Sequence, residues 1–222
     1  FYYPSSAGKG IDIYLMDGGL ITNHEDFNTS ERTITCDAIS KEEDEFPDHG
    51  IMVTSMAGGN IYGVSKKANL HMIAIDFSDD SVLRALDFIK ARAKPNKTII
   101  SMSFAGNYYS QAEDEKHKEL INEGIILIVC ASNENMNCCA PKDDPDFISP
   151  VGYRRAIVVG ATDTDVYGNG YYRASYSNYG DCVDVFAPGT VIFPDLSEGS
   201  RKNSDDASGT SCSTPIVAGI AA

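Results

Sequence analysis

A serine beside a proline-led apolar stretch is the segment of this sequence best suited to chemistry. Residues 209–219 read GTSCSTPIVAG, with small residues around Ser211 and Pro215 opening the apolar part. Proline fits the first turn of a helix, so we expect Ser211 at or just before a helix N-terminus. Backbone N–H groups and the helix dipole favour a developing negative charge there. Taken alone, such a run is more often a Ser/Thr helix cap than a nucleophile.

Two further polar residues lie where predicted strands end. Asp17 ends the apolar run 11–17, and Asn133 directly follows the run 125–132. Ligands bind at the carboxyl ends of the strands in open parallel sheets. Asp17 and Asn133 are therefore candidates for one site.

The elements that would position these residues alternate between strands and helices. Helical spacing of apolar residues predicts helices over 81–93 and 110–123, and Gly124 is a plausible stop for the second. The predicted strands are nearly continuous in Ile, Val and Leu, as in a parallel sheet buried on both faces. They are residues 11–17, 70–77, 98–104, 125–132 and 156–162. This order predicts right-handed crossovers and one layered α/β domain.

Charge narrows the classes of partner. The 222 residues carry 32 acidic and 18 basic side chains, a formal net charge of -14. This balance argues against a nucleic-acid partner, since phosphates require compensating Lys and Arg. It permits cationic peptides or calcium, although a solvated acidic surface is the simpler interpretation. Residues 41–45 (KEEDE) are expected to form such a solvated loop, and no apolar run is long enough for a membrane span.

Cysteines and sequons indicate a compartment. The six cysteines form no CxxC pair, so zinc ligation is not expected. N-x-[ST] sequons occur at Asn28 and Asn96. Together they favour the secretory pathway, with an extracellular or vacuolar destination, where disulfides persist. The sequence does not reveal which cysteines pair.

Several segments, in order, resemble the motifs of the subtilisin-like serine peptidase family. Residues 209–219 resemble its nucleophile motif, GTSMATPHVAG in its commonest form. IDIYLMDGG resembles the aspartate segment, HGIMVTSMAGG the histidine segment and IVCASNEN the oxyanion segment. SMSFAG, YGVSKKANL and SYSNYGDCVDVFAPGT also match, and YGVSKKANL is most like the proteinase K branch. The matches span nearly the whole chain.

The resemblance implies a fold and an activity. The fold is a three-layer α/β domain over residues 1–222, with a central mostly parallel sheet flanked by helices, and both ends fall short of the family's usual limits. The activity is that of a serine endopeptidase with Asp17, His49 and Ser211 as catalytic triad. His49 would be the general base, Asp17 would orient it, and Ser211 would form the acyl-enzyme, a division of labour carried over from subtilisin. Asn133 and the Ser211 N–H would bind the oxyanion, and no cofactor is required for this chemistry.

The resemblance also implies partners. Peptides or proteins would be the substrates, and the precursor would carry an N-terminal propeptide. A substrate strand would bind between two extended segments. Their residues are Ser101, Met102, Ser103, Phe104, Ala105, Gly106, Cys130, Ala131 and Ser132.

Asp184 matches a position that binds structural calcium in some relatives. Main-chain carbonyls near Arg154 and Ala156 would complete that site. The alternative, a loop aspartate that makes local hydrogen bonds, stays open.

Some residues depart from the family pattern. Gly18 and Gly19 stand where DTG or DSG is usual, which removes a hydroxyl near Asp17. Ser132 replaces a glycine, which would narrow the floor of the primary specificity pocket. In the histidine segment, larger side chains replace the usual ones at Ile51, Met52, Thr54 and Ser55. These departures keep a second hypothesis open, a catalytically impaired member of the fold that serves as a peptide-binding module. An α/β-hydrolase esterase is excluded because its triad runs Ser, acid, His.

Overall fold

The computed structural model describes residues 3–40, 47–163, 171–196 and 201–222. The acidic cluster at 41–45 lies outside the described residues. A central sheet has the strand order β2-β3-β1-β4-β5-β6-β7, with β8 paired to β6. All of its pairings are parallel except that of β7 with β6. The predicted α/β class with a mostly parallel sheet is therefore confirmed.

The five predicted strands are present, with ends that differ by a few residues. They correspond to β1 (Asp12–Asp17), β3 (Asn69–Ala74), β4 (Thr98–Met102), β5 (Ile126–Cys130) and β6 (Ile157–Asp163). Five strands that the sequence analysis did not predict add to them. These are β2 (Ile34–Ala38), β7 (Tyr172–Arg173), β8 (Val185–Pro188) and a separate hairpin of β9 (Thr190–Pro194) and β10 (Ser204–Ser208).

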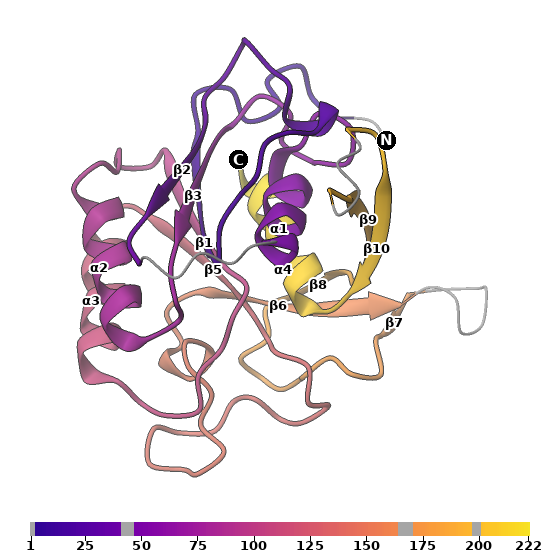
Figure 1. Cartoon of the computed structure of the whole chain (residues 1–222). Helices are drawn as coiled ribbons and strands as arrows, with labels where there is room; N and C mark the ends of the chain where they lie inside the picture. Colours follow the sequence, from indigo (N-terminus) through magenta and orange to yellow (C-terminus); the bar gives the residue numbers. More distant parts are fainter. Residues whose placement is uncertain (1–2, 41–46, 164–170, 197–200) are drawn as a thin grey trace.

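Helices cover both faces of the sheet. Figure 1 shows α2 (Asp79–Lys90) and α3 (Gln111–Asn122) on one side, and α1 (Asp48–Gly58) and α4 (Thr210–Ala221) on the other. Short 3₁₀ turns, η1 (Glu25–Phe27) and η2 (Val151–Tyr153), lie in the connections. Alternate residues of β1 serve the two layers, as the period of a strand requires. Tyr14 and Met16 join the core cluster of α2 and α3, whereas Ile13 and Leu15 join that of α1 and α4.

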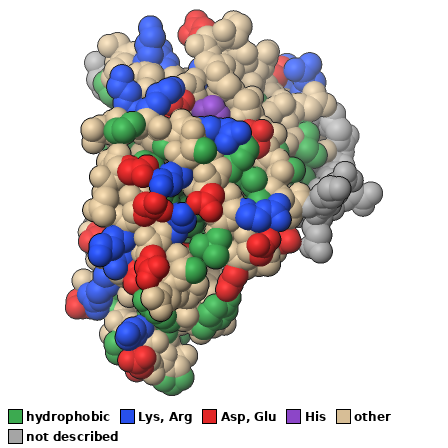
Figure 2. All heavy atoms as spheres, turned by 90° about the vertical axis from the view of Figure 1, so that its left-hand side faces the viewer, with side chains coloured by type: hydrophobic (Ala, Val, Ile, Leu, Met, Phe, Trp, Pro, Cys, Tyr) green, Lys and Arg blue, Asp and Glu red, His purple; other side chains and the backbone are tan. Residues whose placement is uncertain are grey.

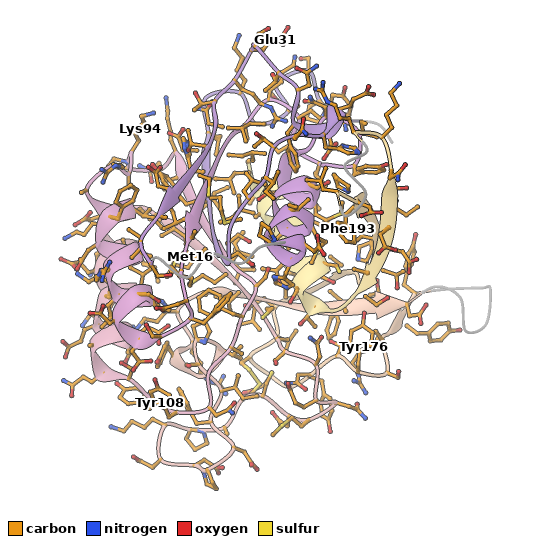
Figure 3. The ribbon with its side chains drawn as sticks, in the orientation of Figure 1. Met16, Glu31, Lys94, Tyr108, Tyr176 and Phe193 are labelled. Carbon is orange, nitrogen blue, oxygen red and sulfur yellow. A yellow bond between two sulfur atoms is a disulfide. The ribbon has the colours of Figure 1, made fainter. Side chains whose placement is uncertain are left out.

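The two layers differ in polarity. On α2, the buried residues Val82, Ala85, Leu86 and Ile89 form one stripe, so the other face meets solvent. That outer face carries interspersed acidic and basic side chains (Figure 2), including the Lys116–Asp87 pair between α3 and α2. Most of α1 and α4 is buried. Phe193 of β9 lies on the side of the hairpin next to α1 (Figure 3) and belongs to the core cluster of α1 and α4.

Local sequence sets the helix ends. The hydroxyl of Ser78 caps α2, and that of Ser110 caps α3. Gly124, at φ +79°, follows α3 in the left-handed conformation that favours glycine, so the predicted stop is confirmed. Among the described residues, no helix combines the length and apolar character needed to cross a bilayer.

Candidate active site

The three triad candidates come from three different elements. Asp17 is the last residue of β1, at the point where the strand order reverses between β1 and β4. His49 is the second residue of α1, and Ser211 is the second residue of α4. Because β1 pairs with β4 at Met16 and Met102, Asp17 at the end of β1 lies next to Ser103, which directly follows β4. Ser211 contacts Ser103, so all three candidates gather at the carboxyl edge of the sheet.

Asp17 and His49 form a hydrogen-bonded pair. His49 Nδ1 lies 2.8 Å from Asp17 Oδ2, and the Asp17 side chain is 1% exposed, against 47% for His49. A carboxylate only accepts, so Nδ1 carries the proton and Nε2 of the neutral ring is left as a base. Burial lowers the pKa of His49, but the hydrogen bond and the negative charge of Asp17 outweigh burial and raise it above its ordinary value.

Glycines fix the contact between the aspartate loop and α1. The Gly18 N–H donates to Asp17 Oδ1 over 2.8 Å, so a backbone group helps to hold the carboxylate. A Cβ at Gly50 would lie 1.9 Å from the carbonyl oxygen of Gly19. Only glycine therefore lets the loop after Asp17 approach the residue next to His49 this closely.

The larger residues of the histidine segment are accommodated in α1. Ile51 and Met52 are buried in the core cluster of α1 and α4. Thr54 Oγ1 donates to the Gly50 carbonyl over 2.7 Å, and Ser55 Oγ donates to Asp26 Oδ2 over 2.7 Å. The extra hydroxyls are therefore paired inside the fold.

Ser211 lies in the first turn of α4, which corrects part of our expectation. The helix begins at Thr210, so Pro215 is inside the helix and not in its first turn. Proline there removes the N–H that would bond the carbonyl four residues earlier, that of Ser211. The hydroxyl of Ser103 replaces it, donating to the Ser211 carbonyl over 3.2 Å.

The Ser211 hydroxyl itself donates to the Ser103 carbonyl, over 3.1 Å. Within the described part of the chain, no hydrogen bond joins Ser211 Oγ to His49. In this rotamer the Ser211 hydroxyl is bonded to Ser103.

Asn133 is fixed by the start of α4. Its Oδ1 accepts from the Thr210 N–H over 2.9 Å and from Thr210 Oγ1 over 3.1 Å. This leaves the Nδ2 group as the free end of the amide. An ideal Cβ on Gly209 would lie 3.7 Å from both Asn133 Nδ2 and the Ser211 nitrogen. The two N–H donors therefore border one small space.

Two residues that hold this arrangement, Thr210 and Asn178, were not predicted from the sequence. Thr210 stands in the GTS motif directly before Ser211, and its place between a glycine and the serine was the available signal. Asn178, in SYSNYG, is fully buried and accepts from the Glu134 and Met136 N–H groups. It fixes the turn that follows Asn133.

The two predicted substrate segments lie next to this site but differ in exposure. Ser101, Met102, Ser103, Cys130 and Ala131 are buried, whereas Phe104 and Ser132 are partly exposed and Ala105 is exposed. Among the described residues, the backbone N–H groups of Ser103, Phe104 and Ala105 have no hydrogen-bond partner. The Ala131 N–H is already paired with the Val159 carbonyl. The edge at 103–105 is therefore the part open to an added strand.

Ser132 adopts an unusual backbone conformation. Its φ is +74°, a region that L side chains rarely occupy. Its hydroxyl donates to Glu134 Oε1 over 2.9 Å. The side chain is thus tied to Glu134 beside Asn133.

Asp184 makes local hydrogen bonds. Its Oδ2 accepts from the Val158 N–H over 2.9 Å, and its own N–H donates to the Val158 carbonyl. One carboxylate oxygen is therefore engaged, and Oδ1 remains as a hard oxygen ligand of the kind that calcium prefers. Together with the carbonyls near Arg154 and Ala156, this donor set fits calcium chemically.

One disulfide is present, between Cys139 and Cys182. Of the free cysteines, Cys36 is exposed, and Cys130, Cys138 and Cys212 are buried. Burial raises the pKa of the Cys212 thiol, next to Ser211, to about 12. That thiol is protonated at neutral pH and is not a competing nucleophile.

Comparisons with known proteins show which family the chain resembles. The model of the subtilase family matches residues 8–222. Subtilisin-like protease 2 of Pseudogymnoascus destructans is 33% identical over all of this chain and 53% of its own length. For the extracellular serine proteinase of a Thermus species the identity is 36%, over all of this chain and 52% of the relative. Proteinase T of Parengyodontium album is 33% identical over all of this chain and 73% of its own length.

A solved structure shows the same fold. The crystal structure of a cold adapted subtilisin-like serine proteinase superposes with a TM-score of 0.80 at 27% identity, covering 99% of this chain and 77% of that one. The chain spans about half the length of the first curated relatives that it matches. With the family match over almost every residue and the same fold in a solved relative, the chain belongs to the subtilase family and is most like its proteinase K branch.

Proposed function

We propose that this chain is the catalytic domain of a serine endopeptidase that cleaves peptide bonds through an acyl-enzyme. The observation that carries the proposal is the 2.8 Å bond between His49 Nδ1 and the buried Asp17 carboxylate, at the edge where Ser211 begins α4. The names of the relatives, a subtilisin-like protease and an extracellular serine proteinase among them, support the same reaction.

In the proposed mechanism the Ser211 side chain rotates from the Ser103 carbonyl toward His49 Nε2. The neutral imidazole takes the hydroxyl proton as the oxygen attacks the substrate carbonyl, and it later gives that proton to the leaving amine. Asp17 holds the tautomer and stabilises the imidazolium. The triad serine is the bond-forming residue in each turnover.

The oxyanion would be held by Asn133 Nδ2 and the Ser211 N–H. The Ser211 N–H has no partner among the described residues. Thr210 holds the Asn133 oxygen, so the amide presents its donor side before a substrate arrives. Donors fixed in advance stabilise the developing charge without reorganising.

The activity is tested by labelling the full-length protein with a fluorophosphonate probe. Labelling of the parent that is lost in both Ser211→Ala and His49→Ala establishes an activated serine. Serine substitution at Cys36 is the control, because this exposed free thiol lies on β2 and not on an element that carries a triad residue.

One observation favours a second function, a peptide-binding module without turnover. The Ser211 hydroxyl is bonded to Ser103 and not to His49. If the folded parent stays unlabelled but binds peptides, this second function replaces the first.

We also propose a secreted location, extracellular or vacuolar, for the mature protein. The disulfide between Cys139 and Cys182 persists in oxidising compartments, and one relative is named an extracellular serine proteinase. Family resemblance further supports peptides or proteins as substrates, an N-terminal propeptide in the precursor and an optional structural calcium at Asp184. The chemistry itself requires no cofactor.

A further inference from the structure

A pocket of about 180 Å³ adjoins the open edge at 103–105. Its walls come from the start of α2, the segment that follows β4, and the start of α3. The volume suits one side chain and is smaller than a typical small-molecule site. This inference rests on the proposed function, because it concerns which substrate the cleft accepts.

Three aromatic residues, Phe77, Phe104 and Tyr108, line the pocket. The rings of Phe77 and Phe104 meet edge to face, with centroids 5.5 Å apart. Tyr108 is 54% exposed and lies just below α2 and α3 (Figure 3). These faces can cover the apolar stem of a long side chain and attract a cation at its end.

The charged residues of the pocket lining, Asp79 and Glu113, are both acidic. Asp79 is the first residue of α2, and Tyr108 Oη donates to it. Glu113 lies in the first turn of α3, is 13% exposed, and accepts from Tyr153 Oη over 2.8 Å. Both carboxylates therefore have neutral hydroxyl donors.

No positive charge balances this pair among the described residues. His117 lies close to Glu113, with its Nε2 3.7 Å from Oε1. His117 is fully buried and both ring nitrogens lack a hydrogen-bond partner. Burial lowers its pKa to about 4, so it is neutral at pH 7.

The acidic groups also oppose one another. Burial raises the pKa of Glu113, and the negative charges of Asp79 and Asp114 raise it further. A cation placed between Asp79 and Glu113 would relieve this repulsion and supply the positive charge that the two carboxylates lack.

We propose that this pocket binds a lysine or arginine side chain of the substrate. Both side chains combine an apolar stem with a cationic end, which matches a pocket lined by aromatic rings and two carboxylates. The pocket reaches Gly106, three residues beyond Ser103, which contacts Ser211. At ~3.3 Å per residue of an extended chain, the basic residue lies about three positions from the cleaved bond.

The test uses matched peptides that carry Lys, Arg, Gln, Leu or Glu at one position, two to four residues to either side of the cleaved bond. For the parent we expect kcat/KM to be about tenfold higher with Lys or Arg than with Gln at one of these positions, the scale of one hydrogen bond to a charged group. The ratio of basic to neutral peptide within each protein is the readout, so a general loss of activity cancels.

The variants Glu113→Gln, Asp79→Asn and their combination should reduce this ratio, the combination to near one. Glu115→Gln, which removes the same charge from the exposed face of α3, is the matched control and should keep the parent ratio. A ratio that the double variant leaves unchanged, or a parent preference for Leu at every position, overturns the proposal.

Failure of the proposed function is distinguished by binding. If the parent cleaves none of the peptides, fluorescence polarisation with Ser211→Ala compares the affinities for the Lys and Gln peptides. Preferential binding of the Lys peptide that Glu113→Gln abolishes supports the pocket without turnover, and equal binding overturns it.

Discussion

Ser103 and Ser211 exchange two hydrogen bonds that run in opposite directions. Ser211 Oγ donates to the Ser103 carbonyl over 3.1 Å, and Ser103 Oγ donates to the Ser211 carbonyl over 3.2 Å. The Ser211 carbonyl can accept this second bond because Pro215, four residues later, has no N–H to donate to it. The end of β4 thus fixes both the side chain and the backbone of the proposed nucleophile.

The first prediction concerns the Ser103 hydroxyl. Ser103→Ala leaves the Ser211 carbonyl without its partner, so we expect the free energy of unfolding to fall by about 1–3 kcal/mol, with a lower kcat. Urea unfolding and peptide turnover measure the two effects. Ser101→Ala is the control, because the buried Ser101 hydroxyl has no partner to lose. Equal destabilisation by both changes would contradict the role of Ser103.

The second prediction concerns the oxyanion. Asn133→Ala removes the Nδ2 donor and should lower kcat by about 10²–10³, the size known for the corresponding donor of subtilisin, with little change in KM. Steady-state kinetics with one peptide provides both constants. Asn122→Ala, on the exposed end of α3, should behave as the parent. A rise in KM at unchanged kcat would instead assign Asn133 to substrate binding.

The third prediction concerns pH. The pKa of His49 is raised, and only neutral His49 can accept the serine proton, so kcat/KM falls as pH drops through a value above ~6.5. Asp17→Asn removes the charge that raises the pKa. The burial effect then dominates, and the acid limb moves to lower pH while kcat decreases strongly. If the acid limb of Asp17→Asn stayed at the same pH as in the parent, the Asp17 charge would not be what raises the pKa of His49.

The same pair affects stability with the opposite pH dependence. The pKa of folded His49 lies above its unfolded value, so protonated His49 adds stability below ~6.5, and this is lost as pH rises through the folded pKa. The difference in unfolding free energy between the parent and His49→Ala should therefore be larger near pH ~5 than near pH ~8.

Periodicity was enough to predict the buried part of the fold. The runs that became β1, β3, β4, β5 and β6 are continuous in apolar residues because both of their faces are covered. β2 and β10 were not predicted because their residues are largely exposed and include polar side chains; β10, for example, reads SDDAS. Their conformation depends on pairing with a neighbouring strand, which local sequence does not encode.

The candidate site was predictable in its residue types but not in its connections. Motif order placed Asp17, His49, Asn133 and Ser211 together, whereas the bond from Ser211 to Ser103 depends on a rotamer and on the position of Pro215 inside α4. Likewise, Asp79 and Glu113 are far apart in the sequence. Each lies in the first turn of its helix, α2 or α3, where acidic residues are common. Only the packing of α2 beside α3 places them in one pocket.

The fourth prediction concerns the calcium proposed at Asp184. At ~1 mM calcium and a dissociation constant near ~10⁻⁴ M, binding adds about 1.4 kcal/mol, which raises the Tm of the parent. Asp184→Asn keeps an acceptor for the Val158 N–H but removes the charge, so its Tm should not respond. Asp146→Asn, at an exposed residue of another loop, should respond as the parent does. A parent whose Tm ignores both calcium and chelator leaves Asp184 with its local hydrogen bonds alone.

The fifth prediction concerns the disulfide. Cys139 and Cys182 are 43 residues apart, and loop-closure entropy for that length corresponds to roughly 4 kcal/mol. Both must be replaced together, because the free Cys138 thiol lies 3.9 Å from Cys182 and is positioned to form a substitute bond. The double Cys139→Ser, Cys182→Ser variant should lose about that much unfolding free energy in urea, whereas Cys36→Ser, at an exposed free thiol, should stay within about 0.5 kcal/mol of the parent. A double variant as stable as the parent would show that packing around Tyr179, and not the covalent link, holds the loop after Asn133 in place.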